Sequence, residues 1–268
     1  MPPATTFFRE TGDGPGVVCL HANASSSSQW RALAALLEPR HRVLAPDGYG
    51  AGRGPAWPAD RRIGLRDEVA LLDPVFARAG DPLALVGHSY GAAVALVAAV
   101  HQQARFRALA VYEPTLFGLV DAASPPPNDA DGIRDAVARA RAALDAGDPD
   151  AAARHFIDYW MGEAAWDAMP EPRRAPIAAA VVHVGGWAHA LFGEPTPLHA
   201  FAALDVPVLY MVGSASPAAS RSVARLLTGV LPRVEVLAFE GLGHMGPVTH
   251  PEVVNPAIVR FLERHRGG

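Results

Sequence analysis

Lysine is absent from this sequence, so all 23 of its basic side chains are arginines. This absence excludes a lysine nucleophile or a lysine Schiff base. A single cysteine, Cys19, excludes an intramolecular disulfide, and its place in the apolar run GVVCL predicts a buried thiol. The net charge of −4 over 268 residues is also small. It gives no electrostatic reason to expect nucleic acid or an anionic membrane as a partner.

Long hydrophobic runs are missing as well. The longest apolar stretch, GAAVALVAAV at 91–100, is too short to cross a bilayer. The first ten residues, MPPATTFFRE, lack the charged and apolar regions of a secretory signal. The histidines show neither H-E-x-x-H nor clustered ligand spacing. We therefore expect a cytoplasmic protein without nucleic-acid or membrane partners and without a metal or other cofactor. The oligomeric state is not predicted.

What the sequence does contain is an alternation of short apolar runs and longer helical patterns. The runs lack strict polar alternation, as is typical of parallel strands that helices cover on both faces. The pattern predicts an α/β fold with a mostly parallel central sheet. The predicted strands are 16–21, 41–46, 83–88, 108–113, 207–213 and 234–240, and the helices between them are 30–37, 62–79, 91–103, 220–230 and 251–265.

This alternation stops between residues 114 and 204. After the proline-rich stretch DAASPPPNDADG, only helical patterns follow, at 132–146, 150–160 and 173–190. Connections in compact domains are normally much shorter, which indicates an inserted helical cap. The predicted domains are a core formed by 1–118 and 201–268 and a cap formed by 119–200.

The stretch LALVGHSYGAAVAL, residues 83–96, carries the strongest functional signal. An apolar strand runs into a G-x-S-x-G motif and an Ala/Val-rich helix follows, which is the context that this motif requires. The glycines Gly87 and Gly91 allow the strand and the helix to approach closely, and the serine between them takes a strained backbone conformation. We predict that Ser89 is a nucleophile. The alternative is a serine with a structural role in the turn.

With this motif on a strand–turn–helix, the sequence resembles the α/β-hydrolase fold family over almost its whole length. HANASSSSQW, residues 21–30, resembles the family's oxyanion loop, and Asn23 and Trp30 match its haloalkane dehalogenase branch. The resemblance implies that the amide of Asn23 or Ala22, together with that of Tyr90, forms an oxyanion hole. The serines at 25–28 could instead serve only to cap the next helix.

Two further loops extend the resemblance. PDGYGAGRG, residues 46–54, resembles a loop in which Asp47 holds turns through its side chain. FEGLGHMGPVTHPEVV, residues 239–254, resembles the loop that carries the family's histidine. This implies that His244 is the general base, rather than His250 or His88.

A histidine base needs a carboxylate that orients it and balances its charge. The family usually has this acid after the strand at 207–213, but Ser216 stands there instead. Some members, including certain haloalkane dehalogenases, carry it one strand earlier. The resemblance to them implies Glu113, at the end of strand 108–113. The alternatives are an acid elsewhere (Asp121, Asp205 and Glu240 fit less well) or a serine–histidine dyad.

Serine rather than aspartate at the nucleophile position favours acyl transfer over halide displacement or epoxide opening. We therefore predict a serine esterase that cleaves carboxylic esters of small to medium substrates through an acyl-enzyme, in a pocket covered by the cap. The residues expected to contact the substrate are Trp30, Trp160, Trp187 and Met245. The alternatives are a C–C bond hydrolase, lactonase or perhydrolase with the same three catalytic residues, or a hydrolase-like binding protein with little turnover.

Overall fold

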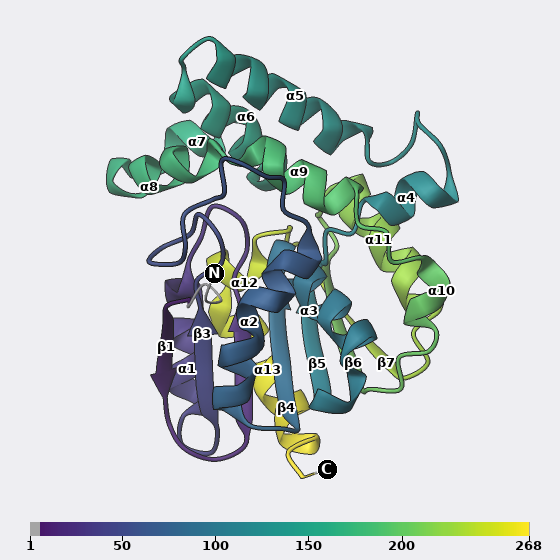
Figure 1. Ribbon diagram of the computed structural model, residues 1–268. Coiled ribbons are helices and arrows are strands. Elements are labelled where there is room, and N and C mark those ends of the chain that lie inside the picture. Colours follow the sequence, from purple (N-terminus) through teal and green to yellow (C-terminus); the bar gives the residue numbers. More distant parts are fainter. Residues whose placement is uncertain (1–5, 268) are drawn as a thin grey trace.

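The computed structural model describes residues 6–267. Residues 1–5 and residue 268 lie outside the described residues. The predicted core and the MPPATTFFRE segment both begin within residues 1–5. Seven strands form one sheet in the order β1-β3-β2-β4-β5-β6-β7 (Figure 1). They are β1 (Phe8–Thr11), β2 (Gly16–Leu20), β3 (Arg42–Pro46), β4 (Leu83–His88), β5 (Phe106–Tyr112), β6 (Val208–Gly213) and β7 (Val234–Phe239).

The predicted strands correspond to β2–β7 within two residues at each end, and they are parallel to one another. The prediction missed β1, which pairs antiparallel with β3 at the edge of the sheet. Its sequence FRET is mostly exposed and therefore lacks the apolar run that revealed the other strands. Because the other six strands are parallel, their carboxyl ends meet at one edge of the sheet, where ligands bind in open α/β sheets.

Helices cover both faces of the sheet, as predicted. One apolar cluster joins the sheet to α2 (Leu65–Ala79), α3 (Tyr90–His101) and α11 (Ala218–Thr228). A second cluster, on the other face, joins it to α1 (Arg31–Leu37) and α13 (Pro251–Arg264). Helix α3 is buried along almost its whole length, which explains why its sequence is apolar on all sides.

Between β5 and β6 the chain forms helices only, and Figure 1 shows several of them lying over one end of the sheet. The predicted helix 173–190 is wrong as a single element. It is two helices that meet at a bend of 59°, and the β-branched and glycine residues around the bend, VVHVGG, are poor helix formers. The division of core and cap at 118/119 and 200/201 stays a prediction. The helices are α4 (Gly118–Ala123), α5 (Asp131–Asp145), α6 (Pro149–Met161), α7 (Ala165–Ala168), α8 (Glu171–Val181), α9 (Val184–Phe192) and α10 (Leu198–Phe201).

No single helix within residues 6–267 is both long and apolar enough to cross a membrane. The bent pair α8 and α9 meets the length and composition criteria only when the two helices are taken together.

Candidate active site

Ser89 lies at a sharp turn between β4 and α3. Its backbone angles, φ 56° and ψ −115°, fall in a region that residues other than glycine rarely adopt. Both flanking glycines are required sterically. A Cβ atom on Gly91 would collide with the carbonyl oxygens of Leu20 and His21, and one on Gly87 would collide with the first turn of α3. The turn therefore holds the Ser89 hydroxyl at the carboxyl edge of the sheet, as the motif predicts.

His244 lies in the loop after β7 and faces Ser89. Its Nε2 atom is 2.9 Å from Ser89 Oγ, and the ring is almost completely buried. Two side chains from the central strands hold the histidine loop by its carbonyl groups. His88 Nε2 donates to the carbonyl of His244 at 2.8 Å, and the Tyr112 hydroxyl donates to that of Gly243 at 2.8 Å.

Glu113, the residue after β5, lies on the other side of the His244 ring. Its Oε2 atom accepts a hydrogen bond from His244 Nδ1 at 2.7 Å. Oε1 accepts from the Gly213 amide at 2.7 Å and from the Ser216 hydroxyl at 2.5 Å. The backbone of Glu113 is at φ 45°, a second unusual conformation within this cluster. The structure thus brings Ser89, His244 and Glu113 together in one chain of hydrogen bonds.

Burial and charge determine the ionisation of these groups. Burial alone would raise the pKa of Glu113. The hydrogen bond and charge of His244, with the hydrogen bonds from Ser216 and Gly213, together hold that pKa below its ordinary value. Burial and the neighbouring His244 lower the pKa of His88 to about 3, so His88 is neutral near pH 7. Its ring nitrogens are also both engaged, since Nδ1 lies 3.1 Å from Gln29 Nε2. His88 therefore supports the loop of His244 and is not available as a base.

The amides expected to form an oxyanion hole do not all remain available. The Ala22 amide donates to Gln29 Oε1 at 3.0 Å, so the prediction of Ala22 as an oxyanion donor is wrong. Within the part of the chain that the structure describes, the amides of Asn23 and Tyr90 have no hydrogen-bond acceptor. Tyr90 is the first residue of α3, where amides lack a partner within the helix. Of the three predicted donors, Asn23 and Tyr90 are thus the two whose amides lack an acceptor.

The four residues expected to contact substrate fall into two groups. Trp160, Trp187 and Met245 line cavities beside Ser89. The Trp160 ring also stacks on His244, with centroids 4.0 Å apart and planes 27° apart. The prediction of Trp30 is wrong, because its side chain is buried in the apolar cluster with α1 and α13 on the other face of the sheet.

Two cavities meet at Ser89. A wide one of about 860 Å³ is lined by both Ser89 and His244 and extends below α6 and α8. A narrow one of about 20 Å³ is lined by Ser89 but not by His244. Its other walls are mostly apolar side chains of α5, α6 and α9, and Asn23 and Thr115 are its polar members besides Ser89. Among residues 6–267, no group of three or more His, Cys, Asp or Glu side chains could hold a metal ion.

With this geometry established, the comparison with known proteins is decisive for the family. The model of the alpha/beta hydrolase family matches residues 17–257. The chain belongs to this family. The resemblance and the fold class predicted from the sequence are therefore confirmed. An alpha/beta hydrolase from Sphaerobacter thermophilus has a similar structure, with a TM-score of 0.76 and 27% identity, over 97% of this chain and 98% of that one.

Three curated relatives carry different names, and one of these names gives no activity. "Putative carbamate hydrolase RutD" of Variovorax paradoxus is 31% identical over 267 residues, which cover 94% of this chain and 93% of that protein. A haloalkane dehalogenase of Bradyrhizobium diazoefficiens is 35% identical over 40% of this chain and 34% of its own length. An uncharacterized protein of Mycobacterium tuberculosis is 33% identical, but the match spans 33% of this chain and only 26% of that protein.

Sequence reasoning missed several residues that support this site. Gln29 links the Ala22 amide to His88, and Tyr112 fixes the histidine loop. No motif marks either residue, since both act through contacts between segments far apart in sequence. Ser216, which stands in place of the usual acid, is a hydrogen-bond donor to Glu113.

Proposed function

We propose that this alpha/beta hydrolase is a serine esterase that cleaves carboxylic esters through an acyl-enzyme. The observation that carries the proposal is the continuous contact Ser89–His244–Glu113, at 2.9 and 2.7 Å, in which each nitrogen of the imidazole has a separate partner. Nδ1 donates to the carboxylate, so Nε2 is free to accept the serine proton. Position 89 carries a serine and not the aspartate nucleophile that halide displacement would require.

In the acylation step, Ser89 Oγ attacks the ester carbonyl carbon while His244 Nε2 takes its proton. The carbonyl oxygen becomes an oxyanion that the amides of Asn23 and Tyr90 stabilise. Glu113 balances the positive charge that develops on the imidazole. His244 then donates the proton to the alkoxide oxygen as the bond from carbon to that oxygen breaks. The alcohol leaves, and the acyl group remains on Ser89.

In the second step a water molecule attacks the acyl-enzyme from the side that the alcohol has vacated. His244 removes a proton from the water and returns one to Ser89 Oγ as the carboxylic acid leaves. Because His244 serves the leaving group and then the water, both must lie on its side of the carbonyl group. The leaving alcohol therefore belongs in the wide cavity that His244 lines, and the acyl chain belongs in the narrow apolar cavity.

The dimensions of the two cavities support small to medium substrates. The acyl cavity is narrow and its walls include Phe117, Trp160 and Leu191, so short apolar acyl chains fit it best. The helices between β5 and β6 supply most of these walls, which is the role expected of a cap. A cytoplasmic location and a small-molecule ester as the only partner stay predictions.

Carbamate hydrolysis is a second candidate function, favoured by the full-length relative named as a carbamate hydrolase. A carbamate carbonyl presents the same oxyanion on attack by Ser89, so the same residues could serve both reactions. The difference would lie in the acyl cavity, which would then have to accept a nitrogen in place of the first carbon of the acyl chain.

A panel of p-nitrophenyl acetate, butyrate and N-methylcarbamate tests both functions. We expect p-nitrophenyl butyrate turnover that Ser89→Ala abolishes, together with covalent labelling of Ser89 by a fluorophosphonate probe. Faster turnover of the carbamate than of the esters would favour the second function. Ester turnover that survives Ser89→Ala would contradict the mechanism, and an unlabelled Ser89 without turnover would favour a hydrolase-like binding protein.

A further inference from the structure

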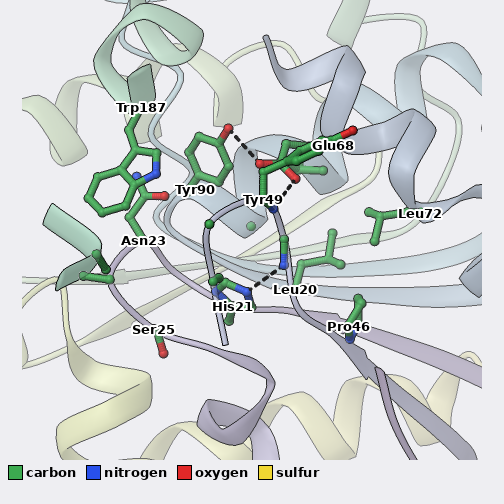
Figure 2. Close-up of a pocket in the computed structure, with 17 residues that line it drawn as sticks. Leu20, His21, Asn23, Ser25, Pro46, Tyr49, Glu68, Leu72, Tyr90 and Trp187 are labelled. Carbon is green, nitrogen blue, oxygen red and sulfur yellow. Dashed lines mark hydrogen bonds between the residues drawn. The ribbon is translucent and has the colours of Figure 1, made fainter. Parts of the chain in front are cut away.

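A third cavity, of about 40 Å³, lies beyond the oxyanion residues and is not needed for the steps above (Figure 2). It is formed where the end of β2, the loop after β3 and the helices α2 and α3 meet. Tyr90, the residue after Ser89, lines this cavity together with Asn23 and Trp187. A volume of this size holds a small polar group or a few water molecules.

The carboxyl group of Glu68, on α2, faces this cavity although its side chain is 95% buried. Its two hydrogen bonds are long. Oε1 accepts from the Tyr90 hydroxyl at 3.3 Å and Oε2 from the Tyr49 amide at 3.4 Å. No arginine within residues 6–267 forms an ion pair with it. A carboxylate has about four acceptor positions, so at least two remain open to a ligand.

The imidazole of His21, another polar group of the cavity, is already engaged at both ring nitrogens. His21 Nε2 accepts from the Gly48 amide at 3.2 Å, and its Nδ1 donates to the Ala22 carbonyl at 2.7 Å. The remaining walls near Glu68 include Leu20, Leu72 and Val94, which are apolar. Glu68 is the one carboxylate among the residues that line the cavity, and it is therefore the strongest hydrogen-bond acceptor there.

The cavity opens toward the leaving-group side of the reaction. Six of its lining residues also line the wide cavity that contains His244, namely Asn23, Ala24, Ser25, Gly50, Ala51 and Ala180. Only Asn23 and Trp187 are shared with the narrow acyl cavity. A group that reaches Glu68 would therefore be carried by the leaving alcohol.

We propose that the Glu68 cavity is a subsite for a hydrogen-bond donor, a hydroxyl or an ammonium group, at the far end of the leaving alcohol. This inference rests on the proposed function, because it assumes that His244 delivers its proton to that alcohol. It adds a substrate class, esters of diols or amino alcohols, to the esterase reaction. Burial raises the pKa of Glu68 to about 7, so near neutral pH both the charged and the neutral acid are present and either can accept a hydrogen bond.

The test compares ω-hydroxyalkyl and ω-aminoalkyl butyrate esters, with alcohols of two to five carbons, with n-alkyl butyrate esters. Each pair of esters is matched in its number of non-hydrogen atoms. In the wild type we expect kcat/KM for the hydroxyalkyl ester to exceed that of its alkyl partner by about tenfold at one chain length, the value of one hydrogen bond to a charged acceptor. In Glu68→Leu the ratio of the two kcat/KM values should fall to about one. Because the ratio is formed within each variant, a general loss of activity cancels.

Glu68→Gln distinguishes the two donors and guards against misfolding of the leucine variant. The amide can accept from a hydroxyl but has no charge for an ammonium group. A hydroxyl subsite therefore keeps most of its preference in Glu68→Gln, whereas a preference for ω-aminoalkyl esters falls at least tenfold. A wild type with no preference at any length, or a preference that neither variant changes, would overturn the subsite. If the wild type cleaves none of these esters, the esterase proposal itself fails and the subsite fails with it.

Discussion

The Ser216 hydroxyl donates a hydrogen bond of 2.5 Å to Oε1 of Glu113, from which it is separated by 103 residues of sequence. Ser216 occupies the position after β6 at which the family usually carries its acid. Here the carboxylate comes from the end of β5 instead, and the serine has become one of its donors. Oε1 is thereby fixed by Ser216 and Gly213, while Oε2 is left to face His244.

The first prediction tests whether the acid can be moved back. Glu113→Gln should lower kcat by about 10³–10⁴-fold, because an amide does not hold the imidazole in the required tautomer or balance its charge. Adding Ser216→Asp to this variant should raise kcat at least tenfold above that of Glu113→Gln alone, since a carboxylate at 216 would lie beside the same histidine. The measurement is p-nitrophenyl butyrate turnover.

Ser214→Asp is the matched control for this rescue. Its side chain lies in the same loop, but it is exposed and binds the Gly241 amide instead of Glu113. It should restore nothing in the Glu113→Gln background. If Glu113→Gln alone left turnover unchanged, the assignment of the acid would be wrong.

Much of the fold could be predicted because burial leaves a local mark in the sequence. Strands β2–β6 are largely buried, so each appears as an apolar run. The edge strand β7 is partly exposed but still mostly apolar in sequence, whereas the edge strand β1 is exposed and leaves no such mark. The bend between α8 and α9 was missed for a related reason. Both halves have helical patterns, and only the weak helix formers between them indicate that the helix stops.

The site residues could be predicted where the backbone geometry that the chemistry needs also requires particular neighbouring residues. Ser89 requires its two glycines, and the carboxyl ends of parallel strands gather at one edge. Trp30 and Ala22 could not be settled in this way. The orientation of Trp30 depends on packing against α1 and α13, and the amide of Ala22 is occupied by the side chain of Gln29.

A second prediction concerns Trp160, whose ring covers that of His244 at a centroid distance of 4.0 Å. The imidazole becomes positively charged in the transition state, and an aromatic face stabilises a desolvated cation by about 1–2 kcal/mol. Trp160→Leu should therefore lower kcat for p-nitrophenyl acetate by about 10-fold. Trp160→Phe keeps an aromatic face and should retain most of the rate.

The acetyl group of p-nitrophenyl acetate is short and makes few contacts with residue 160. The change in kcat of the Trp160 variants therefore reports mainly the stacking on His244. Phe192 provides the control, because it lines the same narrow cavity but makes no aromatic contact with His244. Phe192→Leu should change KM more than kcat. Equal kcat values for Trp160→Leu and Trp160→Phe would show that the stacked ring does not assist the base.

A third prediction follows from the buried neutral ring of His88. Its pKa is about 3 in the folded protein and 6.5 ordinarily. As the pH falls, the unfolded chain therefore protonates His88 at a higher pH than the folded protein does. The contribution of His88 to stability is complete above pH 6.5 and is lost as the pH falls toward 3. The full loss is about 5 kcal/mol, at about 1.4 kcal/mol per unit. In urea unfolding between pH 7 and pH 4, His88→Gln should lose less stability than the wild type. Parallel pH profiles for the two proteins would contradict the low pKa.

The fourth prediction has the opposite sign and concerns Glu68. Burial raises its pKa from an ordinary 4.5 to about 7, so the folded protein keeps the proton that the unfolded chain releases. Its contribution to stability is complete below pH 4.5 and is lost as the pH rises through 7, a change of about 3 kcal/mol. Glu68→Gln lacks this titration. The free energy of unfolding of the variant, relative to the wild type, should therefore rise between pH 4 and pH 8, whatever constant effect the substitution has on packing. If the difference in unfolding free energy between Glu68→Gln and the wild type stayed constant from pH 4 to pH 8, the carboxyl group of Glu68 would not be buried as described.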